Sequence, residues 1–62
     1  MQAEKFIGMS KKEAQDAAER YNLIFRLVSV DNHQFLGYPE DSRVDRVCVE
    51  IEKSKVVKAV LQ

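Results

Sequence analysis

The sequence predicts an α+β domain in which one α-helix packs on a small three-stranded mixed sheet. Three observations favour this fold class: a capped amphipathic stretch near the N-terminus, three later segments rich in β-branched residues, and a long irregular connection between the first two of those segments. The 62 residues have room for one domain, which we place over residues 1–62. Because a chain of this size buries only a small core, a deep catalytic cleft is excluded.

The helix is predicted to begin directly after Ser10. The Ser10 side chain can accept a hydrogen bond from the amide of Glu13, and the Glu13 carboxylate can reach back to the Ser10 amide, as in a capping box. Apolar side chains then recur at helical spacing, namely Ala14, Ala17, Ala18 and Tyr21. Asn22 tolerates the left-handed conformation in which many helices end. The narrow apolar stripe predicts a helix that lies close to the sheet.

Three strands are predicted, over residues 23–30, 44–51 and 56–61. The first is apolar on both faces, as in a central strand. The second alternates apolar residues with Arg46, Cys48 and Glu50, as in a sheet with one wet face. A short turn makes the third strand antiparallel to the second. The connection of about a dozen residues between the first two strands is long enough to make them parallel, which would leave an extended exposed loop along one edge of the sheet.

Residues 31–46 are the candidate working surface. They combine turn formers and charges with Phe35, Leu36 and Tyr38, and they show no apolar periodicity. Compact domains seldom carry a connection this long unless it has a function. The alternative is that Phe35 and Tyr38 fold back over the small core.

Two motifs flank this surface, Gly8-Met9-Ser10-Lys11-Lys12-Glu13-Ala14 and Arg43-Val44-Asp45-Arg46-Val47. In this order they resemble the helix start and the segment after the loop in the potato inhibitor I family, which includes eglin and the barley chymotrypsin inhibitor. The overall pattern is also similar to small bacterial inhibitor-like relatives of that family. The resemblance extends from Phe6 to Val60. It implies a serine protease inhibitor, with a substrate-like loop that occupies the active site of the protease.

The resemblance also implies roles for individual residues. The binding loop falls at about residues 31–42, and its central residues are Leu36, Gly37, Tyr38, Pro39, Glu40, Asp41 and Ser42. Counting back from Arg43 without a gap places the scissile bond between Glu40 and Asp41. Arg46 matches a basic residue that supports the loop in the family, and Arg43 is expected to assist it.

The register of the loop decides which protease it fits. Glu40 in the primary specificity position suits a glutamate-specific protease with a cationic pocket. A slipped register would instead offer Tyr38 or Leu36 to a chymotrypsin-like or subtilisin-like protease. Because no lysine or arginine lies between Asp31 and Ser42, trypsin is not an expected target.

Charge and composition exclude several other functions. Ten basic and ten acidic residues are interspersed and give a formal net charge of zero, so we expect neither a nucleic-acid partner nor a membrane partner. No apolar run approaches a membrane span and the Met1 end lacks a signal-peptide pattern, which predicts a cytoplasmic protein, or a secreted one if the chain is a mature fragment. The single cysteine forms no internal disulfide, and a monomer or weak dimer is expected.

Other readings of the same residues compete with inhibition. His33 with nearby acidic residues suggests a metal site, and His33 with Cys48 a nucleophile pair, but solvated side chains and a packed strand cysteine explain both. We therefore expect no catalytic residue, cofactor or metal. Arg43, Asp45 and Arg46 could form only a salt-bridged sheet edge. The main alternative function is a non-inhibitory cytosolic protein-interaction module on the same scaffold, whose loop or sheet edge docks a partner.

Overall fold

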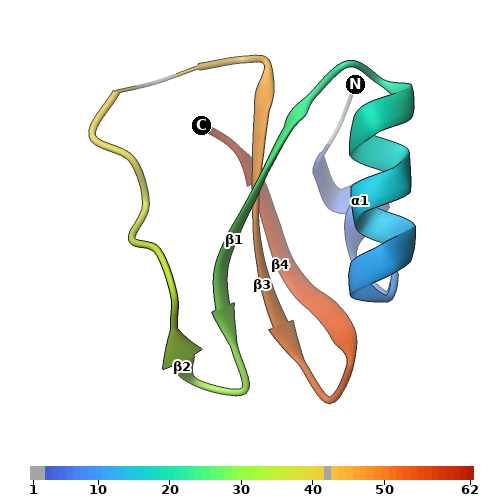
Figure 1. Ribbon diagram of the computed structural model, residues 1–62, viewed down its shortest axis with the longest axis vertical. Helices are drawn as coiled ribbons and strands as arrows, with labels where there is room; N and C mark the ends of the chain where they lie inside the picture. The colour runs from blue at the N-terminus through green and yellow to red at the C-terminus, as the bar shows by residue number, and fades with distance from the viewer. Residues whose placement is uncertain (1–2, 42) are drawn as a thin grey trace.

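One α-helix and a four-stranded mixed sheet make up the fold, so the predicted α+β class is confirmed (Figure 1). The computed structural model describes residues 3–41 and 43–62. Its elements in chain order are the 3-10 helix η1 (Ala3–Phe6), the α-helix α1 (Lys11–Arg20) and the strands β1 (Ile24–Val30), β2 (His33–Gln34), β3 (Arg46–Glu52) and β4 (Lys55–Leu61). The order of strands across the sheet is β2-β1-β3-β4.

Both ends of α1 follow from the local sequence. At the start, the Ser10 side chain accepts from the Glu13 amide at 3.2 Å and the Ser10 amide donates to the Glu13 carboxylate at 2.9 Å, so the predicted capping box is confirmed. At the end, Asn22 has a φ of 60° and donates to the Glu19 carbonyl oxygen at 3.1 Å. The Leu23 amide donates to the Ala18 carbonyl oxygen at 2.7 Å. These two bonds are those of a Schellman motif, and they confirm Asn22 as the left-handed stop.

The core lies between α1 and one face of the sheet. Its buried residues come from η1, α1, β3 and β4, and they are Phe6, Ala14, Ala17, Ala18, Val47, Val49, Ile51 and Val56. The three alanines belong to the predicted apolar stripe and let the helix approach the strands closely. Tyr21 belongs to the same predicted stripe but is 51% exposed, because it is the C-cap residue at which the chain leaves the helix.

The predicted strand pairings are confirmed. β1 and β3 are adjacent and parallel, and β3 pairs with β4 in the antiparallel sense. A two-residue turn joins β3 to β4, with φ angles of 51° at Lys53 and 67° at Ser54 that suit a tight hairpin. The main chain of Val56 in β4 bonds to Gly8 and Met9 at 2.8 Å. The segment that precedes α1 therefore covers part of the outer edge of β4.

The prediction of three strands is wrong, because β2 adds a fourth beside β1. Asp31 and Asn32 have φ angles of 50° and 68°, and their two-residue turn returns the chain antiparallel to β1. β2 contains only His33 and Gln34, both polar and exposed. It therefore lacks the apolar alternation by which a strand is predicted from sequence.

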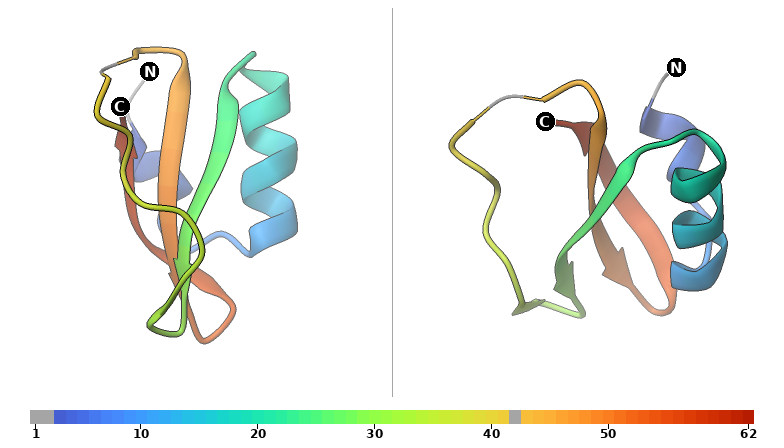
Figure 2. Two further views of the ribbon diagram at one scale, coloured as in Figure 1. Left: turned by 60° about the vertical axis from the view of Figure 1, so that its left-hand side comes forward. Right: turned by 45° about the horizontal axis from the view of Figure 1, so that its top comes forward.

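Residues 35–45 connect β2 to β3, and those that the structure describes contain neither helix nor strand. The connection runs on the side of the sheet opposite α1, as the two views of Figure 2 show. On this outer face lie Arg46 and Cys48, which the strand pattern predicts to face water. Arg46 is only 9% exposed and Cys48 is 0% exposed. The wet-face prediction is thus wrong at these two positions. Arg46 bonds to Asp41 of the connection and to Gln62, and the Cys48 sulfur lies 4.0 Å from the Gln62 carbonyl oxygen.

Candidate functional site

Three side-chain donors of the sheet reach alternate carbonyl groups of the connection. They come from β1, from β3 and from the residue that follows β4. The bonds are Arg26 Nε to the Gly37 oxygen at 2.9 Å, Gln62 Nε2 to the Pro39 oxygen at 3.1 Å and Arg46 Nη2 to the Asp41 oxygen at 3.2 Å. We call residues 37–41 the tethered segment, because a side chain of β1, of β3 or of Gln62 holds the carbonyl group of every second residue in it.

Arg46 is the most buried of the three donors. Its Nε donates to the Gln62 carbonyl oxygen at 2.8 Å, and its Nη2 also donates to the Asp41 carboxylate at 3.0 Å. Charge-assisted hydrogen bonds of this kind are stronger than neutral ones. The hydrogen bond from Arg46 lowers the pKa of the Asp41 carboxyl below its ordinary value. Asp41 therefore stays ionised at neutral pH, and Arg46 holds both its backbone and its side chain.

Tyr38, the second residue of the tethered segment, is fixed to the outer face of the sheet by its side chain. Its hydroxyl donates to the Glu50 carboxylate, and the Lys58 Nζ lies 5.3 Å from the centre of its ring. The same Nζ is 3.8 Å from Glu50 Oε2. Burial, followed by the hydrogen bond to Glu50, raises the pKa of Tyr38. Tyr38 therefore folds back, as one alternative predicts, but onto polar partners on β3 and β4 and not onto the core.

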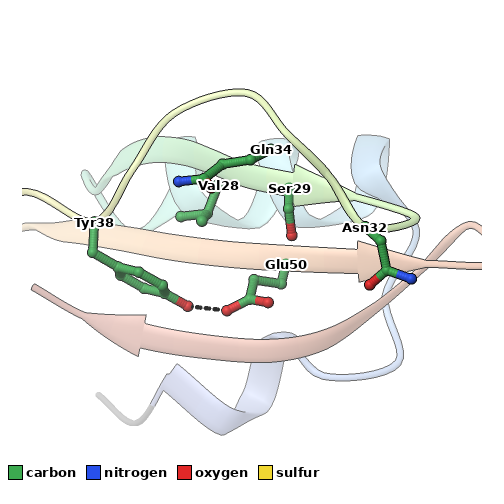
Figure 3. Close-up of a pocket in the computed structure, with 6 residues that line it drawn as sticks. All are labelled: Val28, Ser29, Asn32, Gln34, Tyr38 and Glu50. Carbon is green, nitrogen blue, oxygen red and sulfur yellow. Dashed lines mark hydrogen bonds between the residues drawn. The ribbon is translucent and has the colours of Figure 1, made fainter.

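A hollow of about 370 Å³ lies between the connection and the outer face of the sheet (Figure 3). Its walls are mainly polar, and the lining residues are Val28, Ser29, Asn32, Gln34, Tyr38 and Glu50. In the close-up, the Tyr38 hydroxyl points toward the Glu50 carboxylate at one end of the hollow. Val28 is the one aliphatic residue of this lining. Hydrogen bonds therefore hold the connection in place here, in contrast to the packed face beneath α1.

The first residues of the connection remain attached to β1. The amides of Phe35 and Leu36 donate to the Val28 carbonyl oxygen at 2.9 and 3.2 Å. Their side chains point outward, with Phe35 62% and Leu36 47% exposed. The alternative in which Phe35 folds over the core is therefore wrong.

The two residues predicted to flank the scissile bond are both exposed. Asp41 is bound by Arg46, whereas the Glu40 side chain has no hydrogen-bond or ion-pair partner among residues 3–41 and 43–62. Ser42, the last residue of the predicted binding loop, lies outside the described residues.

Arg43 does not reach the tethered segment. Both of its guanidinium contacts go to the Asp45 carboxylate at 2.8 Å, and about half of each side chain is exposed. The hydrogen bond between them lowers the pKa of Asp45. Arg43 thus forms a surface ion pair within the connection, in place of the expected contact that would support the loop.

Two of the three donors, Arg26 and Gln62, are absent from the sequence-based site. Arg26 is the one charged residue of β1, a strand that is otherwise mostly apolar, and this contrast is a weak signal. Gln62 carries no local signal. Its partner Pro39 is 23 positions away in the chain, so only the folded arrangement brings the two together.

Among the residues described, no helix is long and apolar enough to span a membrane. The same residues contain no group of three or more histidine, cysteine, aspartate or glutamate side chains that could hold a metal ion. Comparisons of the chain with protein-family models, with curated proteins and with solved structures gave no match. The resemblance to the potato inhibitor I family therefore remains a prediction.

Proposed function

We propose that the protein is a serine protease inhibitor that presents residues 37–41 to the protease as an extended, substrate-like segment. The observation that carries this proposal is the set of three hydrogen bonds to the carbonyl groups of Gly37, Pro39 and Asp41. In an extended chain, successive carbonyl groups point to opposite sides. Tethers on the odd-numbered residues therefore leave the carbonyl groups of Tyr38 and Glu40 for a partner.

Tethers on both sides of the Glu40–Asp41 bond account for inhibition in place of rapid digestion. A segment that is already held binds the protease cleft without the ordering cost that a flexible substrate incurs. After cleavage, Gln62 still holds the Pro39 side and Arg46 still holds the Asp41 side. The new ends stay close together, which favours resynthesis of the bond over release of the products.

The decisive experiment removes the side chain that holds Asp41 and compares the effect with that of removing a neighbouring arginine. Arg46→Ala deletes the bonds to Asp41 and Gln62, so we expect cleavage within residues 36–42 to accelerate by about tenfold or more and inhibition to weaken in proportion. Arg43→Ala removes a guanidinium that contacts Asp45 alone among the described residues, and it should change neither quantity by more than about twofold. Equal effects of the two substitutions would contradict the proposal.

A protein-interaction module is the second candidate, and the exposure of Phe35 and Leu36 beside β1 favours it. A panel of chymotrypsin-like, subtilisin-like and glutamate-specific proteases separates the two functions. An inhibitor is cut slowly at one bond and retains its activity. A module is either degraded at many sites or left intact without slowing any protease.

A further inference from the structure

The tethers restrict which residue of the connection can be attacked by a protease. In a serine protease the carbonyl oxygen of the residue before the scissile bond must enter the oxyanion hole. The carbonyl oxygens of Gly37, Pro39 and Asp41 already accept hydrogen bonds from the sheet. Within residues 36–41 this leaves Leu36, Tyr38 and Glu40 for the primary specificity position.

Tyr38 is excluded because its side chain is engaged on the sheet. Its hydroxyl donates to Glu50 and its ring lies under Lys58. Entry into a protease pocket would break the bond to a carboxylate and pull the ring out of its half-buried site. The free energy lost with these contacts would weaken the complex with the protease.

Leu36 is excluded because the residues around it are paired with β1. A protease binds the residues before the scissile bond as an added strand, through their main-chain groups. Gln34 pairs with Ser29, and the amides of Phe35 and Leu36 both donate to Val28. These groups cannot serve β1 and a protease at the same time.

Glu40 satisfies every condition. It is exposed, and no described residue donates to its carbonyl oxygen, while its neighbours Pro39 and Asp41 are both held. The Asp41 carboxylate is paired with Arg46, so Glu40 carries the one carboxylate of the tethered segment that lacks a cationic partner in the part of the chain described. A protease would meet a single free negative charge, at the residue whose carbonyl group is available.

We infer, on the basis of the proposed function, that the target is a serine protease that cleaves after glutamate and holds the Glu40 carboxylate in a cationic pocket. The catalytic serine oxygen would attack the Glu40 carbonyl carbon, and its proton would pass through the histidine to the Asp41 nitrogen as the peptide bond breaks. Hydrolysis of the resulting ester consumes one water and leaves a new carboxylate on Glu40 and a new amine on Asp41. The reverse sequence restores the intact chain.

The test measures inhibition constants against a glutamate-specific serine protease, chymotrypsin and subtilisin, and locates the cut by mass spectrometry. The wild type should inhibit the glutamate-specific protease most strongly, with a cut between Glu40 and Asp41 that adds one water to the mass. Glu40→Gln should weaken this inhibition by roughly thirtyfold or more, because the cationic pocket loses its charged partner. Glu19→Gln, the same change at an exposed position of α1, should have no effect. Glu40→Leu should transfer inhibition to chymotrypsin or subtilisin.

The outcomes separate the specificity from the function itself. Wild-type inhibition of chymotrypsin or subtilisin, with a cut after Leu36 or Tyr38, would overturn the glutamate specificity and leave the inhibitory function standing. Inhibition by Glu40→Leu without any wild-type inhibition of the glutamate-specific protease would have the same meaning. If neither the wild type nor Glu40→Leu slows any of the three proteases, the specificity and the proposed function both fail.

Discussion

On the inner face of the sheet, Val47, Val49 and Ile51 pack with Phe6 and the alanines of α1 in a continuous apolar core. On the outer face, the Arg46 guanidinium and the Glu50 carboxylate of β3 bind Asp41 and the Tyr38 hydroxyl of the connection. Apolar burial therefore determines whether the domain folds, whereas hydrogen bonds determine how one segment is held against it. Substitutions on the two faces should accordingly change different measurements.

The largest effect should come from the inner face. Phe6→Ala removes a fully buried aromatic ring and should lower the free energy of unfolding by about 3–5 kcal/mol, a large part of the net stability of a small domain. Phe35→Ala is the matched control on the outer side, because Phe35 is 62% exposed, and it should change the stability by less than about 0.5 kcal/mol. Urea denaturation measures both. Similar losses in the two variants would show that the faces do not differ as described.

A smaller effect is expected from Tyr38→Phe, which keeps the ring but removes the donor to Glu50. The tethered segment should loosen around Tyr38, and cleavage within residues 36–42 should accelerate by about tenfold while the core remains intact. Tyr21→Phe makes the same change at an exposed site and should leave the rate unchanged.

The raised pKa of Tyr38 adds a second readout. Because the Tyr38 hydroxyl ionises at a lower pH in the unfolded chain than in the folded protein, wild-type stability should fall as the pH rises above about 10. This loss should be smaller in Tyr38→Phe.

Gln62→Ala should have a weaker effect, because it removes one neutral hydrogen bond to Pro39 and keeps the backbone carbonyl group that Arg46 uses. We expect cleavage to accelerate by about fivefold, with no measurable change in thermal unfolding. Gln15→Ala on the exposed side of α1 is the control. A fall in the unfolding temperature equal to that of Phe6→Ala would show that Gln62 stabilises the domain as much as a core residue does, which would contradict the difference between the two faces.

The smallest effect concerns the ion pair of Asp41 with Arg46, because the Asp41 side chain is 68% exposed and screened by solvent. The pKa of the Asp41 carboxyl is lowered in the folded protein. The ion pair therefore contributes fully to stability above the ordinary pKa of about 4, and this contribution is lost as the pH falls through the pKa of the folded state. In the wild type, a carbon-detected NMR titration of the Asp41 carboxyl should give a midpoint below the ordinary value of about 4. Arg46→Ala should move the midpoint upward. An unchanged midpoint would remove Arg46 as the cause.

The elements that local sequence signals specify were predictable. Ser10 and Glu13 define the start of α1, Asn22 defines its end, and the length of the connection indicated the parallel pairing of β1 with β3. β2 was missed because two polar residues after the Asp31–Asn32 turn carry no periodicity. The wet-face prediction for Arg46 and Cys48 failed for a related reason. No sequence pattern indicates the path of the connection, which binds Arg46, or the approach of Gln62 to Cys48.

The candidate site divides in the same way. Arg46 was predicted because it matches a loop-supporting basic residue of the family that the sequence resembles, and it does contact Asp41. Arg26 and Gln62 lie 11 and 23 positions from their acceptors, so only the assembled sheet brings them together.

Cys48 gives the outer face a built-in reporter. It is the only cysteine of the chain, is 0% exposed and lies on β3 between Arg46 and Glu50, the residues that hold Asp41 and Tyr38. Burial raises the pKa of its thiol, which lowers the fraction of reactive thiolate. The rate at which a maleimide dye labels Cys48 should therefore measure how often the connection moves away from the sheet, in the absence of any protease.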